Sequence, residues 1–130
     1  MMHGCPNQVC SEQMSEINSY LPEDKAQANK LGIMDLLLNN AAQILITGHT
    51  HLPFRVDIAA GTIAALNPGS VGQPRDGDPR ASFLTIEING DEFPSIEFHK
   101  AKYDISATQQ PIYKELELPN SIAERLSHAR

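Results

Sequence analysis

Two histidines follow a short apolar segment near the middle of the chain, in the run Gly48-His49-Thr50-His51. Neutral imidazole is the commonest side-chain ligand of metal ions in proteins. Alternate residues near the end of a strand point to the same side, and a glycine before them lets the backbone turn sharply. A single histidine after a strand is most often a solvated side chain, but this paired pattern is much rarer by chance. The run therefore predicts that His49 and His51 bind one divalent ion, or one ion each of a close pair.

The residues before the histidines predict a helix and then a buried strand. Residues 1–24 are rich in loop-forming residues, whereas apolar side chains recur at helical spacing over residues 24–39. We expect this apolar face to pack in the core. It consists of Leu31, Ile33, Met34, Leu37 and Leu38. Residues 43–47 then contain an unbroken apolar run that ends at Gly48, which is typical of a buried strand.

The residues after the histidines predict mainly antiparallel strands. Residues 54–59 and 62–66 flank a hairpin turn at Ala60-Gly61, and the turn Asn89-Gly90 joins 81–88 to 93–100. We expect residues 73–80 to form an exposed loop and the chain after Tyr103-Asp104 to form a tail. A last helix would begin with a capping box of Ser121 and Glu124. This order predicts an α/β layer with a largely antiparallel edge.

Composition narrows the class of protein. The chain has 130 residues, enough for one domain, and a formal net charge of −6 at pH 7, which excludes the basic face of a nucleic-acid-binding protein. No apolar run approaches the roughly 20 residues of a membrane span, and no signal peptide is visible. We therefore expect a cytoplasmic protein in which Cys5 and Cys10 stay reduced and have no special role. His99 and His128 lie away from any motif, and we expect both at the surface.

Three blocks of the sequence resemble a known family. They are His3-Gly4-Cys5-Pro6, the run from Gly48 to His51, and the long block from Asn67-Pro68-Gly69-Ser70 to Ala81-Ser82. Together they resemble the calcineurin-like metallophosphoesterases, most closely the bacterial branch related to diadenosine tetraphosphatase and small phosphodiesterases. The resemblance implies hydrolysis of a phosphate ester at a dinuclear metal centre. It also implies a four-layer α-β-β-α sandwich, of which this chain would form the C-terminal part, mostly an antiparallel β-meander with flanking helices.

The resemblance also shows which family motifs the sequence lacks. Members carry an Asp-x-His pair, a Gly-Asp-x-x-Asp turn and a Gly-Asn-His turn in their N-terminal half, and none of these occurs here. Residues 1–130 are therefore expected to form a partial domain, the C-terminal half. The bridging aspartate, an asparagine ligand and the second catalytic histidine would come from the missing half, so the resemblance assigns no catalytic residue to this chain.

Residue by residue, the resemblance implies three metal ligands. His3 and His49 would bind one ion and His51 the other, which requires His3 to lie close to the other two. Mixed histidine and carboxylate ligands suit Mn, Fe, Ni, Co or Zn better than Mg or Ca, and the resemblance favours manganese or iron. Two arginines, Arg55 and Arg75, are candidates for binding a substrate phosphate. A site-shaping loop would consist of Gly48, Asn67, Gly69 and Ser70, although a Pro-Gly turn is often only a turn.

These observations leave three functional hypotheses. The first is a metal-dependent phosphoesterase fragment, acting on a small phosphate ester or a nucleotide, whose partner is an N-terminal half or a second subunit. The second is a non-catalytic module for oligomerisation, and the third is a protein that binds a single ion through His3, His49 and His51. For the first, we expect at most one weakly bound ion and little turnover in the isolated chain. Two cations without an anionic bridge repel each other by several kcal/mol.

Overall fold

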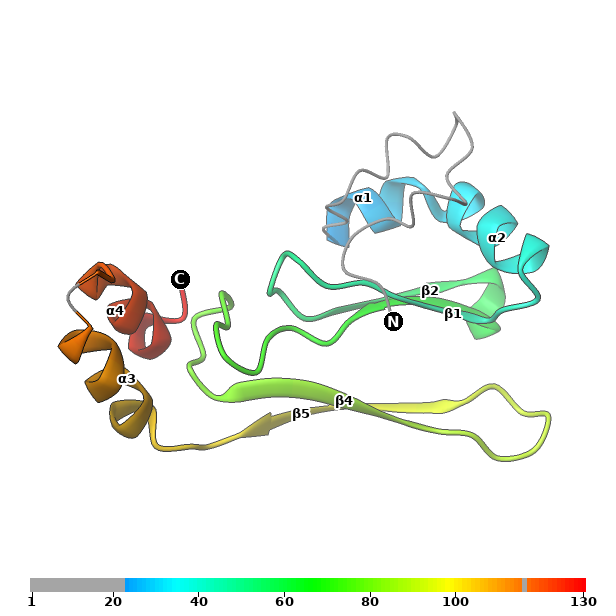
Figure 1. Cartoon of the computed structure of the whole chain (residues 1–130). Helices are drawn as coiled ribbons and strands as arrows, with labels where there is room; N and C mark the ends of the chain where they lie inside the picture. The colour runs from blue at the N-terminus through cyan, green and yellow to red at the C-terminus, as the bar shows by residue number, and fades with distance from the viewer. Residues whose placement is uncertain (1–22, 116) are drawn as a thin grey trace.

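The computed structural model describes residues 23–115 and 117–130 (Figure 1). Two helices precede the first strand, and two more follow the last one. In chain order the elements are α1 (Glu23–Ala28), α2 (Lys30–Asn39), β1 (Ile44–Ile46), β2 (Phe54–Ile58), the short 3-10 turn η2 (Ala59–Gly61), β3 (Ile63–Asn67), β4 (Ala81–Glu87), β5 (Ser95–Ala101), α3 (Ile105–Lys114) and α4 (Asn120–His128). None of the helices in the described part is long and apolar enough to cross a membrane.

The strands form two sheets. In the first sheet the order is β1-β3-β2, with β1 parallel and β2 antiparallel to the central β3. The second sheet is the antiparallel pair β4–β5, in register from Ala81 opposite Ala101 to Glu87 opposite Ser95. Both predicted hairpins are therefore confirmed. The turn between β2 and β3 holds three consecutive residues with positive φ, namely Ala59 (51°), Ala60 (56°) and Gly61 (87°).

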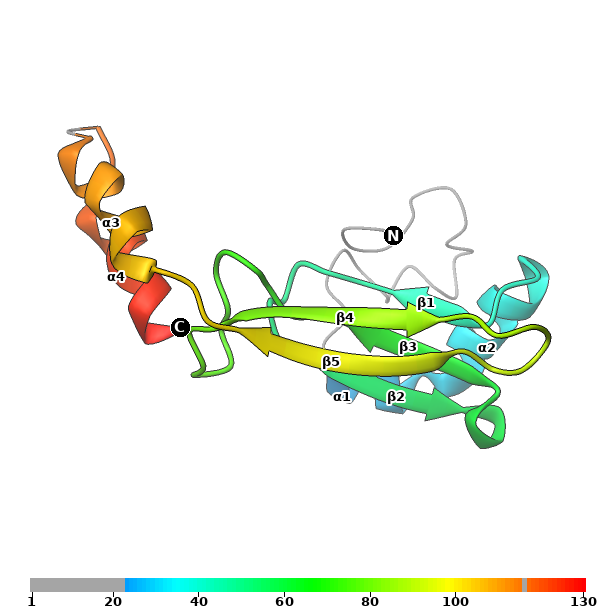
Figure 2. The ribbon, with the colours of Figure 1, turned by 90° about the horizontal axis from the view of Figure 1, so that it is seen from below.

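The elements stack in layers. Figure 1 shows α1 and α2 over one face of the β1-β3-β2 sheet and the β4–β5 pair on its other side. In Figure 2 the helices α3 and α4 lie beside each other beyond one end of the strands. Within the described residues no helix covers the outer face of β4–β5. The predicted α/β class is confirmed, and this part of the chain supplies the α-β-β layers of the expected sandwich with two helices beyond them.

The main core lies between α1, α2 and the three-stranded sheet. Its buried members are Ala26, Ile33, Leu36, Leu37, Leu45, Phe54, Val56, Ile58, Ile63 and Ala65. The predicted helix face was partly wrong, because Leu31 is 73% and Leu38 62% exposed. The helix also divides at Asn29, and its second part is apolar on nearly every side. Spacing alone therefore could not choose between two overlapping faces.

Two predictions near the C-terminus were wrong. The expected tail contains α3, which begins after Asp104, whose carboxylate accepts the backbone N–H of Ala107 at 3.0 Å. The sequence pattern for this helix is weak, because α3 contains Pro111 and buries no residue. The predicted capping box does not form, since α4 begins at Asn120 after Pro119 and has no side-chain cap. The proline carries the φ of −65° that starts the helix, so Ser121 already lies inside it.

Candidate metal-binding loop

The loop after β1 places both histidines in left-handed backbone conformations. His49 has a φ of 75° and His51 a φ of 61°. The N–H of Thr50 donates to the carbonyl of Gly48 at 3.0 Å, which closes a tight three-residue turn around His49. The sequence led us to expect the sharp turn at Gly48, but the recorded left-handed positions are the histidines themselves. Non-glycine residues in this region cost roughly 1–2 kcal/mol each, and such strain clusters at functional sites.

Asn67, at the end of β3, holds this turn in place. Its side chain is fully buried, and its Nδ2 donates to the hydroxyl of Thr50 at 2.9 Å and to the carbonyl of Gly48 at 3.2 Å. Its Oδ1 accepts the backbone N–H of Gly69 at 2.9 Å. One amide group therefore joins the histidine loop to the loop after β3. Asn67 thus holds the two loops together, while its site-shaping role stays a prediction.

The loop after β3 is fixed against β4 by Ser82. The hydroxyl of Ser82 donates to the carbonyl of Pro68 at 2.8 Å, and its backbone N–H donates to the carbonyl of Ser70 at 2.9 Å. Gly69 has a φ of 80°, and a Cβ at this position would lie 2.7 Å from the Ser82 hydroxyl oxygen. Only glycine fits both the backbone conformation and the space here.

The ring of His51 is oriented by a backbone carbonyl. Its Nδ1 lies 2.7 Å from the carbonyl oxygen of Gln73. Because a carbonyl can only accept, Nδ1 carries the proton in this bond, and in the neutral imidazole Nε2 then keeps its lone pair. Metal-binding histidines usually have this arrangement, with the second ring nitrogen donating to a carbonyl or carboxylate. The N–H of Arg75 also donates to the backbone carbonyl of His51, at 3.3 Å.

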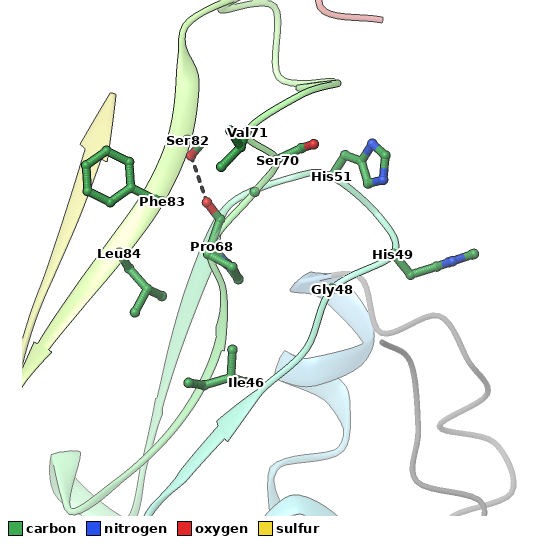
Figure 3. Close-up of a pocket in the computed structure, with 11 residues that line it drawn as sticks. Ile46, Gly48, His49, His51, Pro68, Ser70, Val71, Ser82, Phe83 and Leu84 are labelled. Atoms are coloured by element: carbon green, nitrogen blue, oxygen red, sulfur yellow. Dashed lines mark hydrogen bonds between the residues drawn. The ribbon is translucent and has the colours of Figure 1, made fainter. Parts of the chain in front are cut away.

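The two loops and β4 surround a hollow of about 420 Å³. Figure 3 shows both imidazole rings on the side of the loop away from Phe83 and Leu84. The hollow thus has Phe83 and Leu84 on one side, and the two imidazole rings point outward from the loop on the other side (Figure 3). Its lining consists of Ile46, Gly48, His49, His51, Pro68, Gly69, Ser70, Val71, Ser82, Phe83 and Leu84.

The structure brings together part of the predicted site. Gly48, His49, His51, Gly69 and Ser70 all line the hollow, and Asn67 lies directly behind them. His3, Cys5 and Cys10 lie outside the described residues, so the expected convergence of His3 with the other histidines stays a prediction.

The two arginines lie elsewhere. Arg55 pairs on β2 with Asp57 at 2.8 Å and lines a separate depression with Pro53, Phe54 and Phe98. Arg75 contacts His51 through its backbone, and its residue is exposed. Neither arginine lines the hollow beside the histidines, and their predicted contact with substrate phosphate stays a prediction.

Three residues near the site make contacts that the sequence did not indicate. Gln73 acts through its main-chain carbonyl, which carries no side-chain signature, and Ser82 resembles any strand serine. His99 was expected simply at the surface, but it stacks on Phe83 with ring centroids 4.9 Å apart, and its Nε2 lies 2.8 Å from the Thr85 hydroxyl. The cross-strand register of β4–β5 is what brings these side chains together.

The described residues fit part of a metal site. They contain no group of three or more histidine, cysteine, aspartate or glutamate side chains placed to hold an ion. They do place two imidazoles on one loop that hydrogen bonds hold in position. The Nδ1 contact of His51 leaves Nε2 of the neutral ring as the atom that can bind a metal. Two imidazoles need further ligands, because a zinc ion, for example, takes four.

The comparison with known families agrees with this arrangement. Residues 7–91 match the calcineurin-like phosphoesterase superfamily domain. Because this match covers more than half of the chain, the protein belongs to the calcineurin-like phosphoesterase superfamily.

Individual relatives are longer than this chain. The uncharacterized protein MJ0912 of Methanocaldococcus jannaschii is 34% identical over 101 residues, covering 67% of this chain and 40% of that protein. The structure of a metallophosphoesterase from Sphaerobacter thermophilus aligns with a TM-score of 0.56 and 30% identity, over 68% of this chain and 43% of the other. The hypothetical protein PH1004 of Pyrococcus horikoshii shares the fold, with a TM-score of 0.60 at 17% identity, over 85% of this chain and 39% of its own. The chain thus spans less than half the length of each of these relatives.

Proposed function

We propose that this chain carries the C-terminal part of a metal-dependent phosphoesterase site, with His49 and His51 as ligands of divalent ions. The observation that carries the proposal is the bond between His51 Nδ1 and the Gln73 carbonyl, which leaves Nε2 of the neutral ring as the atom that can bind a metal. Two such ions, if bound there, would supply charge neutralisation for the phosphate ester and a water that is nucleophilic at neutral pH. The residues of this chain hold and orient the two imidazoles.

The donor chemistry and the resemblance set the proposed metal and substrate. Imidazole ligands suit Mn, Fe, Ni, Co or Zn, and the resemblance to the family favours manganese or iron. The proposed substrate is a phosphodiester or phosphomonoester of a small molecule or a nucleotide. The cytoplasmic location expected from the sequence belongs to the same proposal.

The site needs residues beyond those described. We propose that an N-terminal half or a second subunit supplies the anionic ligands, and that the chain alone binds at most one ion weakly. The open edge of β1 supports this. Gln43 offers its carbonyl and Thr47 its N–H to β3, so the main-chain groups of Ile44 and Ile46 face the other edge. No strand of the described part pairs with that edge, and such an edge readily accepts another strand.

The test compares the chain alone with the chain supplied with a complementary N-terminal half taken from the Methanocaldococcus relative. Hydrolysis of a chromogenic phosphodiester is measured with added Mn²⁺. We expect turnover from the mixture only, and its loss with H51Q. His128 is an exposed histidine on α4, so H128Q is the matched control and should keep the activity. Robust turnover by the isolated chain would contradict the proposed incompleteness, and an active H51Q would contradict the ligand assignment.

A protein that binds a single ion is the second candidate function. It is favoured by the two imidazole donors of the described residues, to which His3 would add a third. Metal analysis and titration calorimetry of the purified chain separate the candidates. Tight binding of one ion per chain, unchanged when the N-terminal half is added, would favour the single-ion protein over the phosphoesterase.

A further inference from the structure

The loop formed by residues 73–80 holds His51 from outside the histidine loop. The carbonyl of Gln73 accepts from the His51 ring, and the N–H of Arg75 donates to the His51 backbone. Pro74, between these two residues, is buried. The loop contains no helix or strand, so its own position must be fixed by contacts with other elements.

One ion pair ties this loop to β5. The ammonium group of Lys100 bonds the carboxylate of Asp76, and the two side chains are only 20% and 19% exposed. Lys100 lies directly opposite Ser82 in the β4–β5 register. Ser82 fixes the loop after β3, so neighbouring positions of one hairpin hold both loops that surround the histidines.

A second ion pair in the same loop differs in kind. Arg80 bonds Asp78 at 2.6 Å, but the two residues are only two positions apart in the loop, and their side chains are 45% and 31% exposed. This pair bonds two residues of the same loop and is more exposed to solvent than the Lys100–Asp76 pair, so it contributes less to the loop's position. The two pairs thus form a natural comparison, one that connects elements and one that does not.

We propose that Lys100 is a positioning residue for His51. Through Asp76, Lys100 holds the loop whose Gln73 carbonyl selects the Nδ1-protonated form of the His51 ring and directs Nε2 toward the ligand position. The expected effect on metal binding rests on the proposed function, whereas the expected effect on the tautomer of the His51 ring does not require a metal.

The experiment measures the His51 ring in the metal-free full chain by nitrogen-15 NMR at pH 8. We expect the wild type to show the Nδ1-protonated tautomer, K100M to show a mixture of both tautomers, and K100R to restore the wild-type pattern. Amide exchange at Arg75 should accelerate in K100M. R80M is the matched control, because it removes the exposed pair of the same loop, and it should leave both readouts unchanged.

Titration with Mn²⁺ provides the second readout. The removal of partners that orient a metal ligand typically weakens metal binding 10- to 100-fold, so we expect about a tenfold higher Kd for K100M. If K100M folds and keeps both the wild-type tautomer of His51 and the wild-type amide exchange at Arg75, the inference is overturned. If K100M fails to fold, the double variant D76K/K100D, in which the two charges are exchanged, tests the proposal instead. This variant must show the wild-type tautomer of the His51 ring. The proposed function fails separately, if the mixture with the N-terminal half shows no turnover with Mn²⁺, while the NMR readouts on the metal-free chain still test Lys100.

Discussion

At the scale of single residues, the loops around the histidines contain positions where one added carbon atom is expected to change the free energy of unfolding. Gly69 and Gly77 have the same φ of 80°, but a Cβ on Gly69 would lie 2.7 Å from Ser82 Oγ, whereas nothing lies within 4 Å of a Cβ on Gly77. Both substitutions would force alanine into the left-handed region, and only the first would also create a clash. The pair therefore separates backbone strain from overpacking.

We predict that G69A lowers the free energy of unfolding by about 3 kcal/mol and G77A by about 1 kcal/mol, because the clash adds to the shared backbone strain. Urea unfolding of the two variants measures both values. Equal losses would show that Ser82 yields freely and that the loop after β3 is not held as tightly as its hydrogen bonds indicate.

A carboxylate near the C-terminus gives a pH-dependent prediction. The N–H of Ala107 and the hydroxyl of Ser106 bond the Asp104 carboxylate and lower its pKa below the ordinary value of 3.8. A lowered pKa stabilises the folded state fully above 3.8, and this contribution is lost as the pH falls through the lower, folded-state pKa. We expect amide exchange at Ala107 to accelerate over that acidic range.

The matched variant is D104N, because asparagine caps a helix without titrating. Its Ala107 amide should show no such acidic step. A carboxyl titration of Asp104 with a midpoint at or above 3.8 would contradict the prediction.

At the scale of elements, turn chemistry allowed much of the β structure to be predicted. The Ala60-Gly61 and Asn89-Gly90 signals correspond to the two observed hairpins. The α2 face could not be predicted, because apolar side chains surround that helix. The helix α3 was missed because a proline and a polar composition hide its pattern. The γ-turn at His49 also has no local signature, since distant Asn67 stabilises it.

The β2–β3 turn offers a stabilising substitution. Ala60 is exposed and has a φ of 56°, which asparagine tolerates better than alanine. We predict that A60N raises the free energy of unfolding by about 1 kcal/mol, measured by thermal or urea unfolding. The control A28N replaces an exposed helical alanine and should be neutral or slightly destabilising. A loss of stability in A60N would show that contacts of the alanine methyl outweigh the backbone strain.

At the scale of the whole molecule, the described residues surround a hollow beside the two histidines. The sequence motifs were sufficient to indicate the superfamily, and the loop from Gly48 to His51 lies beside a hollow. The further ligands of the proposed site could not be predicted as contacts, because the family motifs that carry them do not occur in this sequence.

The open edge of β1 makes this incompleteness measurable. We predict that the amides of Ile44 and Ile46 exchange rapidly in the isolated chain, whereas that of Leu45, which faces β3, is protected. Addition of a complementary N-terminal half should slow the two exposed amides about 100-fold or more, because each would gain a ladder hydrogen bond. Unchanged exchange in an active mixture would show that the halves join at another surface.

The left-handed histidines have a consequence for how this chain would change under selection. Glycine or asparagine at position 49 accommodates a φ of 75° with less strain than histidine. Directed evolution for heat resistance alone would therefore favour losing that imidazole, while a screen for metal retention would preserve it at the expense of melting temperature. Running both selections in parallel from the same library would show whether thermal robustness and ligation compete at this single position.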